Sequence, residues 1–171
     1  EFYIKEFCEY YISQGVDFIY IIDDDSNDKS IYNEINSTKV KIIWEKDIIG
    51  TGLPNRFYKT IRDQFEWLIY VDVDEFITTT SSVTIRTKLI NQFNNYDVVY
   101  IPWVFMSANG QKNNPKSVLK ENIYRWNHDN KHINNRVNHK FGDRYNCIEG
   151  KSIFKCKMFT DICDHHPYNY I

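Results

Sequence analysis

Short apolar runs alternate with helix-like segments over the first 105 residues, and this alternation limits the possible folds more than any other feature. Four runs rich in Ile, Val and aromatic residues are typical of strands that are buried on both faces. They are residues 17–22, 40–44, 67–71 and 98–101. Helical patterns occupy residues 2–14, 28–36, 54–66 and 83–94. Such alternation predicts an α/β fold with a mostly parallel central sheet flanked by helices.

Local signals mark several of these boundaries. Gly15 follows the first helical pattern and is a typical C-terminal stop. Ser26 or Asn27 is expected to cap the second helix, because both residue types accept hydrogen bonds from a helix N-terminus. Pro54 fits the first turn of the third helix. The last 65 residues are less regular, with short strands and loops expected, and no linker or repeat divides the chain. We therefore expect one domain over residues 1–171.

Composition excludes several partners. The net charge of −2 provides no basic surface for nucleic acid. No apolar run approaches the roughly 20 residues that a membrane-spanning helix needs. The four cysteines are Cys8, Cys147, Cys156 and Cys163, and none forms the close pair of a zinc site. Reduced cysteines in a cytoplasmic protein are expected, with a disulfide among the last three left open.

Two of the predicted strands end in acidic residues. Asp23–Asp25 follow the first strand, and Asp72 and Asp74 follow the third. Residues two apart on an extended chain point to the same side, so Asp72 and Asp74 can serve one ligand. Ligands of open parallel sheets bind beyond the carboxyl ends of the strands. Convergent carboxylates there repel each other unless a cation such as Mg²⁺ or Mn²⁺ binds them. A lone Asp-x-Asp is more often a solvated acidic turn than a metal site.

Several motifs occur in the order found in one enzyme family. Asp23-Asp24-Asp25-Ser26-Asn27-Asp28 resembles a D(D/N)xSxD turn, and Trp67–Ile77 resembles a W-x-x-x-x-D-x-D-E-F segment. Phe105–Gly110 is similar to an F-G-S-S/N-G loop. Lys151-Ser-Ile153 and His165-His166-Pro167 resemble a later Lys-x-Ile and a terminal His. Together they resemble family-2-like and family-92-like glycosyltransferases of the GT-A fold, which is a Rossmann-like nucleotide-diphospho-sugar transferase fold.

The resemblance implies a hexosyl- or deoxyhexosyl-transferase that uses Mn²⁺ or Mg²⁺ in glycan biosynthesis. The donor would be a nucleotide sugar, with UDP-sugars favoured, and the acceptor a hydroxyl on a glycan, protein or lipid. Roles carry over by position: metal binding to Asp72, Asp74 and His165, nucleotide-sugar binding to Asp23, Asp25, Arg56 and Asp72, and acceptor binding to Ser107, Asn109 and Gly110. Asp164 is the candidate catalytic base, with Asp129 and Asp161 as alternatives, and Glu75 is expected to orient the turn.

The chain also departs from the family pattern. It begins inside the helix that follows the family's first strand, so that strand is expected to be missing. Met106 and Ala108 replace smaller or polar residues in the acceptor loop. No late Gln-x-x-Arg-Trp motif occurs, which argues against a processive synthase. Two alternatives stay open: a metal-dependent phosphotransferase or hydrolase, and a catalytically inert module that binds sugar or nucleotide.

Overall fold

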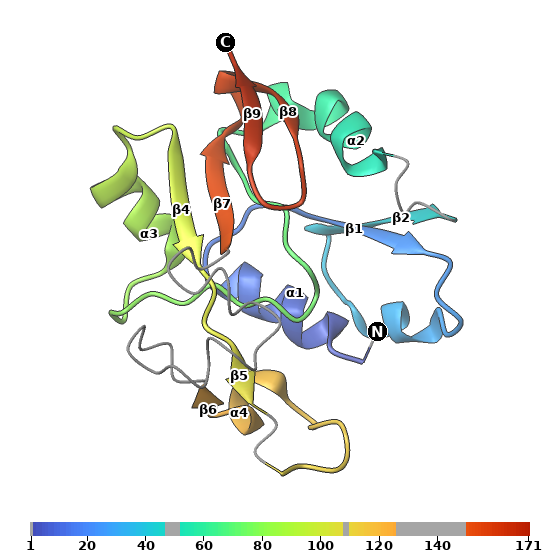
Figure 1. The fold of residues 1–171 in the computed structure, drawn as a ribbon. Coiled ribbons are helices and arrows are strands. Elements are labelled where there is room, and N and C mark those ends of the chain that lie inside the picture. Colours follow the sequence, from blue (N-terminus) through green and yellow to red (C-terminus); the bar gives the residue numbers. More distant parts are fainter. Residues whose placement is uncertain (1, 47–51, 108–109, 126–149) are drawn as a thin grey trace, which may run out of the picture. The chain divides into compact units, whose positions relative to one another are not determined.

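The computed structural model describes residues 2–46, 52–107, 110–125 and 150–171 (Figure 1). The chain divides into two compact units, where one comprises Glu1–Val99 with Ser152–Ile171 and the other Tyr100–Lys151. The sequence had predicted a single domain. No helix within the described residues is long and apolar enough to cross a membrane.

Helix α1 (Ile4–Ser13) ends as the sequence predicted. Gly15 adopts a φ of 87°, a left-handed conformation that glycine accepts without strain. Its N–H donates to Ile12 O at 3.1 Å, and Val16 N–H donates to Tyr11 O at 3.1 Å. These bonds satisfy carbonyls of the last turn and stop the helix. The buried face of α1 carries Ile4, Phe7, Cys8 and Tyr11.

Strands β1 (Ile19–Asp24) and β2 (Val40–Glu45) form a parallel pair, with Asp23 opposite Trp44. A short 3₁₀ helix, η1 (Ser30–Glu34), lies between them in sequence. The prediction that Ser26 or Asn27 caps this helix is wrong. The N–H of Ser26 is instead held by the carboxylate of Asp23 at 2.9 Å, which draws this residue into the turn after β1.

The remaining helices of the first unit are α2 (Leu53–Ile61), η2 (Arg62–Gln64), α3 (Ile85–Lys88), the π-helical η3 (Leu89–Phe93) and η5 (Cys156–Met158). Its remaining strands are β3 (Trp67–Leu68), β8 (Phe159–Ile162) and β9 (Pro167–Tyr170). Strands β4 (Val98–Pro102) and β7 (Gly150–Lys155) carry the chain into and out of the second unit. That unit also contains β5 (Met106–Ser107), α4 (Val118–Glu121) and β6 (Tyr124–Arg125). Pro54 lies in the first turn of α2, as predicted.

The described strands form four small sheets, and the predicted central parallel sheet is not among them. The sheets are β1–β2, β3–β7–β4, β5–β6 and β8–β9. The predicted strand 67–71 is shortened to Trp67–Leu68, which pairs antiparallel with β7. The mixed α/β class is therefore confirmed, whereas the extent of parallel pairing is corrected. After Leu68 the chain belongs to no described sheet, and it turns at Asp72–Glu75, where Glu75 N–H donates to Asp72 O at 3.0 Å.

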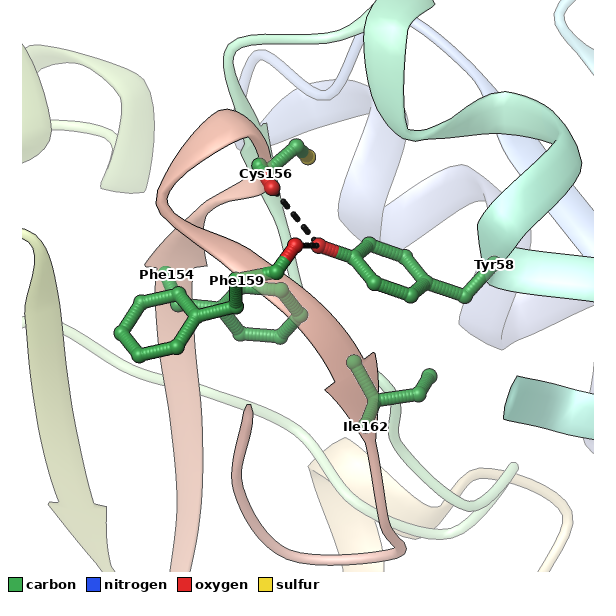
Figure 2. Packing of buried hydrophobic residues seen from close by; sticks show 5 residues of the cluster. All are labelled: Tyr58, Phe154, Cys156, Phe159 and Ile162. Carbon is green, nitrogen blue, oxygen red and sulfur yellow. Dashed lines mark hydrogen bonds between the residues drawn. The ribbon is translucent and has the colours of Figure 1, made fainter. Parts of the chain in front are cut away.

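The core of the first unit joins α2 to the C-terminal strands. Buried residues Tyr58, Phe154, Cys156, Phe159 and Ile162 form one cluster (Figure 2). The single hydroxyl hydrogen of Tyr58 is shared between Cys156 O at 2.7 Å and Phe159 O at 2.9 Å. Burial raises the pKa of Tyr58 to about 12 and that of the Cys156 thiol to about 12, so both groups stay neutral.

The described cysteines are all free thiols. Cys8 and Cys156 are buried, and Cys163 is half-buried. Burial raises the pKa of Cys8 to about 11, so this thiol stays protonated at neutral pH. A disulfide between Cys156 and Cys163, one of the pairings left open by the sequence, is therefore not formed, and Cys147 lies outside the described residues.

Replacing Tyr58 by Phe tests this core. Tyr58→Phe leaves two buried carbonyls short of a donor, and we expect the free energy of unfolding to fall by about 1–3 kcal/mol. Urea denaturation followed by circular dichroism measures this change. Tyr96 is 59% exposed, so Tyr96→Phe is a matched control that should stay within about 0.5 kcal/mol of the wild type. Equal stability of the two variants would contradict the role given to Tyr58.

Candidate functional site

Asp72, Val73, Asp74 and Glu75 form a tight turn that its own atoms stabilise. Glu75 N–H donates to Asp72 O at 3.0 Å, and Asp72 N–H donates to the Glu75 side-chain Oε2 at 2.9 Å. The Asp72 and Asp74 side chains are exposed, whereas Val73 and Glu75 are half-buried. Glu75 thus makes the orienting contact expected of it, and the two aspartates are left accessible to a ligand.

Two tyrosines of α1 hold the chain just after this turn. Tyr11 donates its hydroxyl hydrogen to Glu75 O at 2.9 Å and accepts a hydrogen bond from Ile77 N at 3.2 Å. Tyr10 donates to Ile77 O at 2.5 Å. The ring of Phe76 packs against both, with centroids 5.3 Å from Tyr10 and 6.5 Å from Tyr11. The acidic turn is therefore anchored to a helix that lies more than 60 residues earlier in the chain.

The sequence analysis gave no role to the hydroxyls of Tyr10 and Tyr11. A buried tyrosine hydroxyl needs a hydrogen-bond partner, and the adjacent Tyr10-Tyr11 pair on a helix was the available signal. Burial raises the pKa of both phenols, so both remain protonated and able to donate.

The β8–β9 turn carries a further acid, Asp164. Cys163 N–H donates to His166 O at 3.0 Å and closes the turn, which presents an exposed Asp164 and a half-buried His165. Burial raises the pKa of Tyr70, and the negative charge of Asp164 raises it further. Asp72 and Glu75 act on the same phenol in the same direction. The charges of Asp164 and of the acidic turn therefore act on one phenol, that of Tyr70.

Asp161, an alternative candidate for the base, is instead held by four side chains. It accepts hydrogen bonds from Asn55 at 2.9 Å, Thr160 at 2.6 Å and Asn169 at 2.9 Å, and its Oδ1 lies 2.5 Å from Lys59 Nζ. The Lys59 contact, followed by the other three, holds the pKa of Asp161 well below its ordinary value. A carboxylate with this many donors is a poor proton acceptor, so its position suits a structural role.

The turn after β1 places Asp23 in the protein interior. Its side chain accepts hydrogen bonds from Ser26 N at 2.9 Å and from the hydroxyl of Tyr32. Burial by itself would raise the pKa of Asp23, but these hydrogen bonds and the charge of Lys29 outweigh burial and lower it. Asp23 is therefore ionised, and both of its oxygens already accept a hydrogen bond.

Asp25 has a φ of 57° and is exposed at the end of the same turn. Its carboxylate lies 3.2 Å from Lys46 Nζ and 3.5 Å from Lys29 Nζ. The hydrogen bond and charge of Lys46, with the charge of Lys29, lower the pKa of Asp25. Asp25 thus forms ion pairs with two lysines at the carboxyl end of the parallel strand pair.

Trp44 was given no role in the sequence analysis. It lies at the end of β2 and remains 49% exposed. Lys29 Nζ lies 5.0 Å from the centroid of its ring, and Tyr32 packs edge-on at 5.2 Å. A large aromatic residue near a strand-end acid was a usable signal, because aromatic faces bind planar ligands and cations.

The two acidic clusters are not joined through a sheet. The partner of β1 is β2, whereas β3 pairs with β7, so the expected convergence of neighbouring strand ends is not found. Within the described ranges, no three His, Cys, Asp or Glu side chains are arranged to hold a metal ion. Asp72 and Asp74 offer two exposed carboxylates, which fits a Mg²⁺ or Mn²⁺ ion that takes its other ligands from water and substrate phosphates.

Other predicted site residues lie elsewhere. Arg56 is exposed on α2, and its N–H donates to Gly52 O at 3.0 Å in the first turn. Ser107 belongs to β5 of the second unit and pairs with Tyr124, and Gly110 is exposed in the same unit. Asn109 and Asp129 lie outside the described residues.

No family model, curated protein or solved structure matches this chain.

The ion pair at Asp161 predicts a specific pH dependence of stability. Because folding lowers its pKa, Asp161 stabilises the protein above the ordinary aspartate pKa of about 4, and this contribution is lost as the pH falls below that value. We expect Asp161→Asn to be less stable than the wild type near neutral pH, and the difference to shrink in acid.

Urea denaturation across this pH range measures the effect. Asp63→Asn is the control. The Asp63 side chain is exposed, and its ion-pair contact with Arg62 is long, at 3.9 Å. Parallel stability curves for Asp161→Asn and the wild type would contradict the account.

Proposed function

We propose that this chain is a glycosyltransferase domain of the GT-A type. It would transfer a hexose or deoxyhexose from a nucleotide diphosphate sugar, with UDP-sugars favoured, to a hydroxyl acceptor on a glycan, protein or lipid. The observation that carries the proposal is the anchored acidic turn, on which Asp72 and Asp74 are exposed. The charges of Asp72 and Asp164 both raise the pKa of Tyr70. The order of the motifs in the sequence supports it.

Asp74 would bind a Mn²⁺ or Mg²⁺ ion directly, and Asp72 would bind the ion or the donor ribose. The cation supplies positive charge that stabilises the departing nucleoside diphosphate. The protein contributes a turn whose backbone is already fixed by Glu75 and by the tyrosines of α1. Pre-organised ligands of this kind need no reorganisation when charge develops on the leaving group.

Asp164 would act as the base that accepts the proton of the acceptor hydroxyl. It is exposed on the β8–β9 turn, as an acid that meets an incoming acceptor must be. Asp161 is less suited, since four donors stabilise its charged form. His165, next to Asp164 and half-buried, would contact the metal or the diphosphate from this turn.

The turn after β1 would bind the nucleoside. Asp23 fixes the shape of this turn through Ser26 and Tyr32, and Asp25 positions Lys29 and Lys46 beside it. The positive charge of these lysines favours a phosphorylated ligand. Arg56, exposed on α2, would contribute further charge toward the phosphates. Ser107, Asn109 and Gly110 would contact the acceptor.

Asp74→Asn tests the proposal directly. It keeps the size of the side chain but removes the charge, and we expect Mn²⁺-dependent release of nucleoside diphosphate from the donor sugar to fall roughly 100-fold or more. The assay uses a panel of nucleotide sugars with Mn²⁺ and a chelator control. Asp63→Asn, which changes an exposed aspartate after α2, should retain wild-type turnover.

The outcomes separate the competing functions. Metal-dependent hydrolysis of simple phosphate monoesters would overturn the proposal in favour of a phosphotransferase or hydrolase. Nucleotide-sugar binding without turnover would indicate an inert binding module. Full activity of Asp74→Asn would refute the metal assignment.

A further inference from the structure

The segment after β3 is bonded to side chains of α1 near its end. From Ile69 to Thr78, no residue belongs to a sheet of the described residues. Three of its backbone groups are bonded to phenol hydroxyls: Glu75 O and Ile77 N to Tyr11, and Ile77 O to Tyr10. Two side chains of α1 therefore satisfy backbone groups on both sides of Phe76.

The hydroxyl of Tyr11 is the central contact of this arrangement. It donates one hydrogen bond and accepts another, and only 3% of the residue is exposed. The ring is fixed as well, since Phe7 packs against it with centroids 4.7 Å apart and Phe76 stacks on it with an interplanar angle of 9°. Little freedom remains for the hydroxyl to bond elsewhere.

A chain of hydrogen bonds connects this hydroxyl to the exposed aspartates. Tyr11 holds the carbonyl of Glu75, and the Glu75 side chain in turn holds the N–H of Asp72 at 2.9 Å. Asp74 lies between these two fixed residues in sequence. Loss of the Tyr11 bonds would release the Glu75 backbone and, through it, the relative direction of both aspartates.

We infer that Tyr11, assisted by Tyr10, is a positioning residue for the acidic turn, and that its hydroxyl sets the affinity of Asp72 and Asp74 for a divalent cation. This inference rests on the proposed function, and it adds a dependence of the metal site on the first helix. Tyr11 touches neither metal nor substrate, and it acts through Glu75.

A pair of variants separates the effect of Tyr11 from the loss of a tyrosine hydroxyl elsewhere. Tyr11→Phe keeps the ring packing and removes one hydroxyl with two backbone hydrogen bonds. Tyr170→Phe removes a hydroxyl that donates to Asp97 Oδ2 at 2.8 Å. Mn²⁺ binding in the presence of uridine diphosphate is measured from the electron paramagnetic resonance signal of the free ion. We expect roughly tenfold weaker binding for Tyr11→Phe and unchanged binding for Tyr170→Phe.

Amide hydrogen exchange supplies a second measurement that needs no metal. In Tyr11→Phe the amides of Asp72, Glu75 and Ile77 should exchange faster, roughly tenfold. The amide of Cys156, which donates to Glu66 O at 2.9 Å, should keep its wild-type rate. Unchanged exchange in the turn would overturn the inference whatever the metal result.

Different results would overturn the role of Tyr11 and the proposed function. If the wild type binds Mn²⁺ and Tyr11→Phe binds it equally well, the inference is overturned and the proposed function stands. If the wild type shows no Mn²⁺ binding that depends on Asp74, the metal-dependent transferase is overturned. The exchange rates then still decide whether Tyr11 orders the turn.

Discussion

The hydrogen bonds from α2 to the C-terminal strands are the constraint on which the rest of the first unit depends. Tyr58 satisfies the carbonyls of Cys156 and Phe159, and Asn55 accepts the N–H of Ile162 at 2.9 Å. These contacts join segments about 100 residues apart and are buried among aromatic rings. The Asn55 contact holds the end of β8, from which the chain enters the β8–β9 turn.

Two helices therefore support the candidate site from two directions. The tyrosines of α1 fix the turn that carries Asp72 and Asp74, and α2 fixes the hairpin that carries Asp164. The supporting side chains are buried or partly buried, whereas these three aspartates are exposed. Buried supports and exposed aspartates suit a site that must be rigid before a charged ligand arrives. Displaced aspartates would stabilise the charge of that ligand less.

Local features of this fold were predictable, and contacts between distant segments were not. The apolar run before Asp23, the stop at Gly15 and the Pro54 turn follow from short-range preferences, and the structure confirms them. The strand after residue 66 was expected to be five residues long, but only Trp67 and Leu68 pair. Nothing in that run indicates that pairing stops after Leu68.

The candidate site was partly predictable for the same reason. The spacing of Asp72 and Asp74 indicated a shared ligand, and both are exposed on one turn. That the Asp23 turn follows a strand of a different sheet was missed, since the pairing of β3 with β7 depends on residues far along the chain. The saturation of Asp161 by four donors was hidden as well, because Asn55 and Lys59 approach it from another helix.

Paramagnetic relaxation by Mn²⁺ tests the central claim most directly. Nuclear magnetic resonance spectra of the labelled chain with uridine diphosphate would be recorded before and after adding Mn²⁺, which broadens amide signals close to the ion. The account predicts selective broadening at Asp72 to Glu75 and at Asp164 and His165. Broadening centred on another part of the chain, with these amides unaffected, would contradict it.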